Sequence, residues 1–221
     1  MEGIPKIKSK SKVRKENDEQ RYNVLVLDTS ASSSFLDSSG NIFYTADTAI
    51  DYVKASAKKF IEGVQKADGT NYVAIVEYKG STANVVSEFS TDFVSLNAAI
   101  DGLYASQNTR NVAAGLQKAD TLINEISNPK AIKNVVLFTT GMTNDGEYSY
   151  DGHYNEDTIG SEWRRSDTQV RLYAYSNAAY AMAETLKSKA TVYSVGLFQM
   201  MENMPEEGLE IVQFFKLFSS E

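Results

Sequence analysis

The chain has 221 residues, enough for one sizeable α/β domain or at most two small ones. Its 29 acidic and 22 basic side chains leave a net charge of −7, which disfavours non-specific binding to nucleic acid or to anionic membranes. The absence of cysteine excludes disulfides, thiolate metal sites and a cysteine nucleophile. No run approaches the ~20 apolar residues of a membrane span, so no direct membrane insertion is expected.

The beginning of the chain is predicted to be a mobile leader or linker, residues 1–21. It contains a short basic run followed by acidic residues, and it has few large apolar side chains to bury. The basic run lacks interleaved aromatic residues, which favours a solvated tail over a nucleic-acid arm. Residues 22–221 are predicted to form a single domain.

From Tyr22 onward, short apolar runs alternate with helical periodicity. Runs rich in β-branched and aromatic residues predict four buried parallel strands, at Val24–Leu27, Tyr72–Val76, Val135–Phe138 and Thr191–Val195. Apolar residues three and four apart predict helices within 50–64, 93–103, 112–126, 175–186 and 211–218. The turn at 79–82 is too short for a crossover helix, so 84–89 should pair antiparallel with the second strand. We therefore expect an α/β fold with a doubly wound, mostly parallel sheet, one antiparallel edge hairpin and helices on both faces.

A polar loop follows the first predicted strand. Its spacing Asp-x-Ser-x-Ser lets Asp28, Ser30 and Ser32 converge on one point, and such hard oxygen ligands suit Mg²⁺ or a similar cation. The alternative is a serine-rich loop whose hydroxyls only satisfy backbone groups. Sites in such sheets lie outside the carboxyl ends of the strands, where strand order reverses.

Two further segments are expected at the same edge. Thr139, Thr140 and Gly141 follow the third of these predicted parallel strands, and Asn108–Asn111 precedes the helix predicted within 112–126. Taken alone, Thr109 or Asn111 is most simply an N-cap of that helix.

Together, the three segments resemble the metal-ion-dependent adhesion site of the von Willebrand factor A domain, and the resemblance covers nearly everything from Tyr22 to the end of the chain. That site combines an Asp-x-Ser-x-Ser loop, a Thr before a later helix, and an Asp directly after a later strand. Asp28, Ser30 and Ser32 match the first part, and Thr109 matches the second. The resemblance implies a vWA, Rossmann-like fold similar to those of Gram-positive surface proteins.

The third part departs from the family pattern, because Thr140 stands where the second carboxylate is usual. The resemblance implies Mg²⁺, or Mn²⁺ or Ca²⁺, bound by Asp28, Ser30, Ser32, Thr109 and Thr140. Binding is expected to be weak because one carboxylate leaves a net charge of about +1 on the ion. Asp145 is a candidate replacement, although Asn-Asp-Gly is first of all a turn signal. In such a site, Asp28→Ala is expected to remove metal binding with little loss of stability.

A long insertion is predicted at about 141–171. It is rich in aromatic residues, which argues against simple disorder, and its Tyr148, Tyr150, Tyr154 and Trp163 are candidates for partner binding. A self-packed loop that buries its own rings is the alternative.

The expected function is a non-enzymatic adhesion module at the cell surface or outside the cell, with a cytoplasmic location as the alternative. The family resemblance implies a protein ligand that supplies a carboxylate to the metal. One alternative is a degenerate domain that binds partners without metal. The other is a haloacid-dehalogenase-like phosphatase, which is disfavoured because Ser30 replaces its second Asp. The sequence does not determine the oligomeric state.

Overall fold

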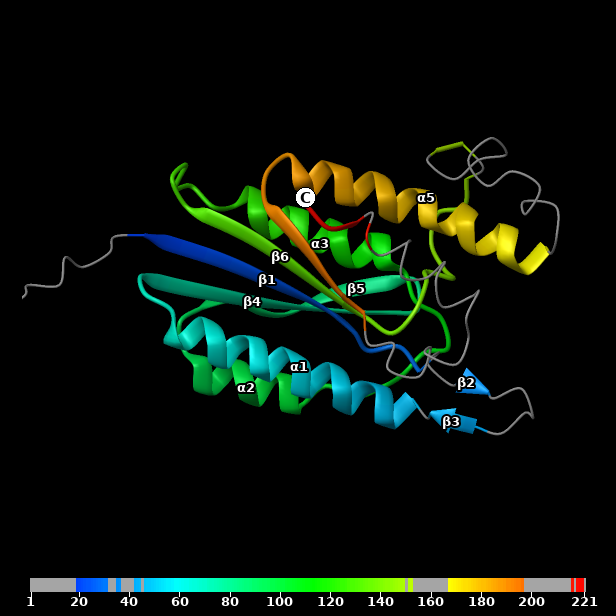
Figure 1. Cartoon of the computed structure of the whole chain (residues 1–221), viewed down its shortest axis with the longest axis horizontal. Helices are drawn as coiled ribbons and strands as arrows, with labels where there is room; N and C mark the ends of the chain where they lie inside the picture. Colours follow the sequence, from blue (N-terminus) through cyan, green and yellow to red (C-terminus); the bar gives the residue numbers. More distant parts are fainter. Residues whose placement is uncertain are drawn as a thin grey trace, which may run out of the picture.

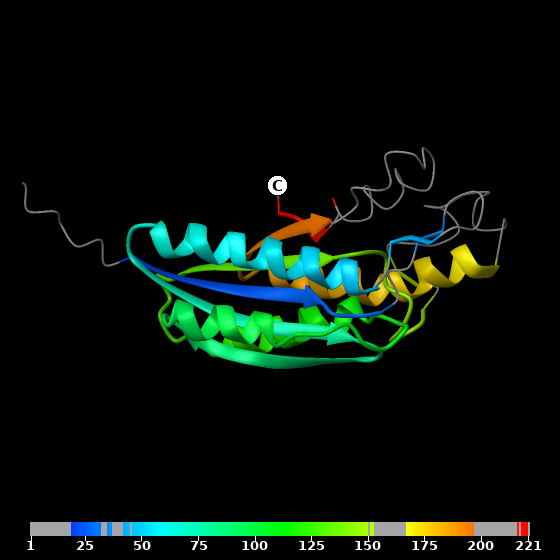
Figure 2. The ribbon, with the colours of Figure 1, turned by 90° about the horizontal axis from the view of Figure 1, so that it is seen from below.

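In the computed structural model, a five-stranded sheet runs along the molecule and is covered by helices on both faces (Figures 1 and 2). The structure describes residues 19–31, 35–36, 42–44, 46–149, 151–152, 167–196, 216 and 218–220. The strands of this sheet are β1 (Gln20–Asp28), β4 (Thr70–Lys79), β5 (Thr82–Ser90), β6 (Ile132–Thr139) and β7 (Thr191–Gly196). A separate antiparallel pair, β2 (Phe35–Leu36) and β3 (Ile42–Tyr44), follows β1 in the chain and was not predicted from the sequence.

The strand order β5-β4-β1-β6-β7 confirms the predicted doubly wound sheet. The central strand β1 pairs in parallel with β4 on one side and with β6 on the other, and β6 pairs in parallel with β7. Within this sheet, the short turn between β4 and β5 produces the one antiparallel pair among the described strands, as predicted. Strand order reverses beside β1, so the loops after β1 and β6 lie side by side at the carboxyl end of the sheet. We call this end the carboxyl edge; it is on the right in Figure 1.

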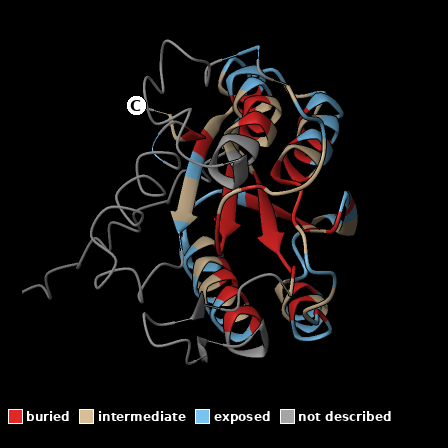
Figure 3. Cartoon of the chain, turned by 90° about the vertical axis from the view of Figure 1, so that its right-hand side faces the viewer, coloured by how far each residue is buried: buried red, intermediate tan, exposed pale blue. Residues whose placement is uncertain are grey.

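Helices α1 (Ala46–Lys66) and α2 (Phe93–Asp101) cover one face of the sheet, and α3 (Val112–Asn124) and α5 (Asp167–Lys187) cover the other. Successive residues of a strand point to opposite faces. Leu25 and Leu27 therefore pack with α1 and α2, whereas Val24 and Val26 pack with α3 and α5. Figure 3 shows the resulting buried sheet between exposed outer helix faces.

The differences from the predicted boundaries are small. β1 begins at Gln20, so two residues of the predicted leader belong to the sheet. α5 begins at Asp167, inside the predicted insertion. The helix predicted within 211–218 lies outside the described residues except for positions 216 and 218, of which Phe218 is buried in the core on the α3 and α5 face. No helix in the described parts of the chain is both long and apolar enough to cross a membrane.

Close contact between α3 and the sheet depends on Gly115. A Cβ atom at this position would lie 2.8 Å from Cγ1 of Val26 and 3.0 Å from Cδ1 of Tyr78. Alanine normally favours a helix over glycine by about 1 kcal/mol. At Gly115, however, the added methyl group would force α3 away from β1 and β4.

Substitution of the two helical glycines Gly115 and Gly63 should therefore change stability in opposite directions. We expect Gly115→Ala to lower the free energy of unfolding by about 1–3 kcal/mol through overpacking. The control Gly63→Ala lies in α1 with no atom within 4 Å of the added Cβ, and it should raise stability by about 0.5–1 kcal/mol. Urea denaturation measures both changes, and equal stabilisation by the two variants would contradict the close packing.

Candidate functional site

Three loops meet at the carboxyl edge. The loop after β1 pairs with the loop before α3 through a bridge between Ser30 and Ser106. The loop before α3 also contacts the β4–β5 turn, where Gly80 N donates to Thr109 O at 2.7 Å. Asn111 begins α3 as its N-cap, with its side-chain oxygen accepting from Ala114 N. The loop before α3 is thereby held next to the ends of β1 and β4.

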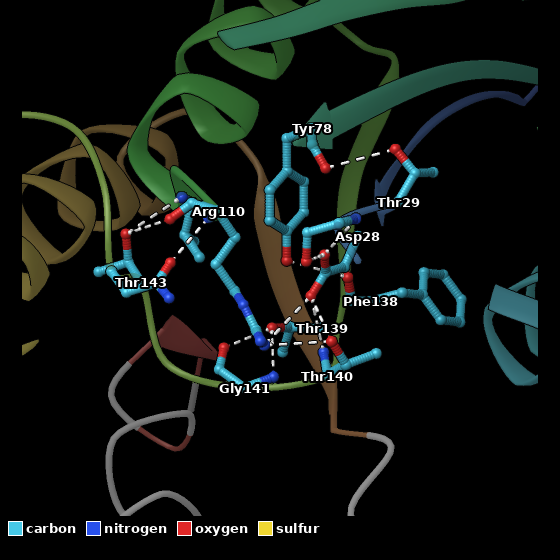
Figure 4. A network of polar contacts seen from close by, with 12 residues as sticks. Asp28, Thr29, Tyr78, Arg110, Phe138, Thr139, Thr140, Gly141 and Thr143 are labelled. Atoms are coloured by element: carbon cyan, nitrogen blue, oxygen red, sulfur yellow. Dashed lines mark hydrogen bonds and ion pairs between the residues drawn. The ribbon is translucent and has the colours of Figure 1, made fainter. Parts of the chain in front are cut away.

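Asp28, the last residue of β1, is the centre of the site (Figure 4). Its side chain is fully buried, and both carboxylate oxygens accept hydrogen bonds. Oδ1 accepts from the backbone N and the hydroxyl of Ser30, at 3.0 and 2.7 Å. Oδ2 accepts from the backbone N and the hydroxyl of Thr140, at 3.0 and 2.7 Å. Three of the residues predicted from the sequence, Asp28, Ser30 and Thr140, therefore lie together.

Arg110 supplies the positive charge in this cluster. Its Nη1 lies 3.5 Å from Oδ2 of Asp28 and donates to the hydroxyl of Thr140 at 3.1 Å. The guanidinium also lies against Gly141, since a Cβ at that position would be 2.3 Å from Nη1. Only 5% of the Arg110 side chain is exposed, so Asp28 and Arg110 form a buried ion pair.

Tyr78 closes the site from the β4 side. Its hydroxyl donates to the carbonyl of Phe138 at 3.2 Å, and its side chain is fully buried. Burial, and secondly the nearby negative charge of Asp28, raise the pKa of Tyr78 well above its ordinary value. Tyr78 therefore stays a neutral hydrogen-bond donor and adds no charge to the site.

The other predicted metal ligands are arranged differently. The hydroxyl of Thr109 donates to Oδ2 of Asp145 at 2.5 Å, and Oδ1 of Asp145 accepts from Gly146 N. The candidate replacement carboxylate is thus bound to Thr109. Ser32 lies outside the described residues.

In this arrangement, the residues around Asp28 do not fit a divalent cation. At an effective dielectric constant of about 20, two unit charges about 4 Å apart interact by about 4 kcal/mol, so Arg110 would repel a dication by about twice that amount. Both oxygens of Asp28 already accept hydrogen bonds, from Ser30, Thr140 and Arg110. Within the described ranges there is also no group of three or more His, Asp or Glu side chains that could hold a metal ion.

The role of Arg110 was missed in the sequence analysis, although a signal was present. The metal-site pattern lacks a carboxylate at Thr140, and a basic residue directly follows Thr109. A site that loses a negative charge and gains a positive one no longer needs an external cation for neutrality.

Of the aromatic residues predicted to bind a partner, only Tyr148 is described, while Tyr150, Tyr154 and Trp163 lie outside the described residues. The ring of Tyr148 is 41% exposed and meets Tyr175 of α5 edge to face, with ring centroids 5.3 Å apart. Ser149 N donates to Ala174 O, and Asn177 Nδ2 donates to Ser149 O. The first part of the predicted insertion therefore packs on α5.

The buried ion pair changes the expected effect of Asp28→Ala. Removal of the carboxylate takes away the buried charge that faces Arg110 and removes an acceptor for Ser30 and Thr140. Breaking a buried pair in this way costs about 3–5 kcal/mol, and we expect the free energy of unfolding to fall by that amount. Asp101→Ala, which breaks an exposed ion pair with Lys58, should cost no more than about 1 kcal/mol. Equal losses in urea denaturation would argue against the buried pair.

The family model of the von Willebrand factor type A domain matches residues 23–143. The collagen alpha-1(VI) chain of Xenopus laevis is 25% identical over 99 residues, which are 44% of this chain and 10% of the collagen chain. This chain therefore spans only about a tenth of the length of that relative.

Solved structures share the fold at low sequence identity. The von Willebrand factor domain of the type V pili tip protein Mfa5 from Porphyromonas gingivalis has a TM-score of 0.65 and 15% identity, and the match covers 92% of this chain and 87% of that one. The pilus adhesin SpaC from Lactobacillus rhamnosus GG, in its open conformation, has a TM-score of 0.66 and 16% identity, with 93% and 27% covered. Because the family model covers more than half of its residues, this chain belongs to the von Willebrand factor type A domain family.

Proposed function

We propose that this domain is a non-enzymatic protein-interaction module that binds a protein partner with the loops of the carboxyl edge, at the cell surface or outside the cell. The observation that carries the proposal is the convergence of three loops at this edge in a chain of the von Willebrand factor type A family. The names of its relatives, a pilus tip protein, a pilus adhesin and a collagen chain, support a surface or extracellular location.

The aromatic residues around the site suit a protein partner. Tyr104 is 65% exposed in the loop that precedes Ser106, and Nζ of Lys79 lies 4.5 Å from its ring centroid. Lys79 is itself paired with Glu77 at 3.1 Å. An exposed tyrosine that is held in place by neighbours is typical of the few residues that dominate binding energy at an interface.

The chemistry of Asp28 disfavours the phosphatase alternative. A phosphoryl acceptor needs an accessible carboxylate oxygen, but the side chain of Asp28 is buried and both of its oxygens accept hydrogen bonds. Ser30 is also not a general acid. We therefore expect no hydrolysis of p-nitrophenyl phosphate above a buffer control.

A Mg²⁺-dependent form of the same function is the alternative predicted from the sequence, with a carboxylate of the partner completing the ion's coordination. The grouping of Asp28, Ser30 and Thr140 supports it, and the position of Arg110 opposes it. We favour binding without metal.

Binding to a panel of purified extracellular-matrix and cell-surface proteins tests the proposal. With a bound panel member, Tyr104→Ala and Tyr148→Ala should each weaken the affinity by about tenfold or more. Val94→Ala is the control because Val94 is 81% exposed at the start of α2, which is at the opposite end of the sheet. Equal binding by all four proteins would contradict binding at the carboxyl edge, and loss of binding in EDTA would favour the metal-dependent form.

A further inference from the structure

We propose that Arg110 is a built-in cation that takes the position of a metal ion at the carboxyl edge, so that the site is complete without metal and closed to Mg²⁺. The consequence of this arrangement for partner binding rests on the proposed function. Its own test measures metal binding and needs no partner.

The backbone of Arg110 is fixed at both of its polar groups. Its N donates to Oδ1 of Asn144 at 2.7 Å, and its carbonyl accepts from Asn144 N and from the hydroxyl of Thr143, both at 3.1 Å. A bridge to Gly80 holds the other side of the loop. The side chain therefore starts from a fixed point and reaches across to Asp28 and Thr140 (Figure 4).

The surroundings of the guanidinium are shaped for it. Gly141 leaves space for the guanidinium. The Cβ of any larger residue at this position would lie 2.3 Å from Nη1 and 3.0 Å from Cζ of Arg110. Thr140 contributes a hydroxyl that accepts from Arg110 and donates to Asp28. A neutral residue at position 140 suits one carboxylate that faces one guanidinium.

A metal ion would need the oxygen atoms of Asp28 and Thr140 that Arg110 now contacts. Mg²⁺ binds oxygen at about 2.0–2.1 Å and requires a nearly octahedral shell. Oδ2 of Asp28 already takes two hydrogen bonds from Thr140 and the ion pair with Arg110. Entry of a dication therefore requires the guanidinium to leave a buried position in which it neutralises Asp28.

The experiment compares the wild-type domain with a variant in which the cation is removed and a carboxylate is added, Arg110→Ala with Thr140→Asp. Isothermal titration calorimetry with MgCl₂ and MnCl₂ measures metal binding, and thermal unfolding in EDTA and in MgCl₂ measures metal-dependent stability. The wild type should bind neither ion at millimolar concentration, and its Tm should be the same in both buffers. The double variant should bind Mn²⁺ at least about tenfold more tightly than the wild type, and its Tm should be higher in MgCl₂ than in EDTA.

A third protein separates the effect of charge from that of an altered loop. Arg110→Lys with Thr140→Asp retains a positive charge beside the added carboxylate, and its metal affinity should stay below that of the Arg110→Ala double variant. Equal affinities of the two variants would overturn the inference. Millimolar Mg²⁺ binding by the wild type, or a fall of its Tm in EDTA, would overturn it even if neither variant folds. The effect of Tyr104→Ala on partner binding is a separate measurement, so failure of the metal test would leave the proposed function standing.

Discussion

The buried pair of Asp28 and Arg110 is the interaction on which the carboxyl edge depends. It joins the end of β1 to the loop that begins α3, and Thr140 adds the end of β6 to the same cluster. A charge is costly to bury unless it is paired and hydrogen-bonded, so each of these two residues lowers the cost of burying the other. Three segments that are far apart in the sequence are therefore held in one arrangement, and the loops between them are positioned by it.

The sheet topology explains why this pair forms at a loop edge. β1 has parallel neighbours on both sides, and α1 and α3 pack on it, so Val24 to Leu27 have no exposed surface. Asp28 is the first residue after this apolar run, and its side chain lies among polar groups. Reversal of the strand order beside β1 brings the end of β6 next to it, which supplies Thr140 as the partner. The apolar core and the polar site are thus consecutive parts of one strand.

The sheet could be predicted from sequence because its signals are local. Short β-branched runs predicted β1, β4, β6 and β7, and the short turn after Lys79 predicted the antiparallel pair. The pair β2–β3 was missed because two or three residues carry no periodicity. In the site, Asp28 and Ser30 were found by their spacing at the end of a predicted strand, and Thr140 was found by its place after another predicted strand and by the family resemblance. The role of Arg110 depends on the contact of its side chain with Asp28, which is 82 positions away in the sequence. Strand or helix periodicity does not encode such a contact.

A cation supplied by the chain differs physically from a bound ion. A metal site exchanges with solvent, and its occupancy follows the ion concentration, whereas a guanidinium fixed by its own backbone is always present. Its hydrogen bonds are directional, which suits a defined contact to Asp28 and Thr140 but leaves no open coordination position for a partner's carboxylate. Under the proposed function, partner recognition at this edge comes from groups around the pair. Tyr104, which is held by Lys79, and Tyr148, which rests on Tyr175, are the described aromatic residues placed to provide it.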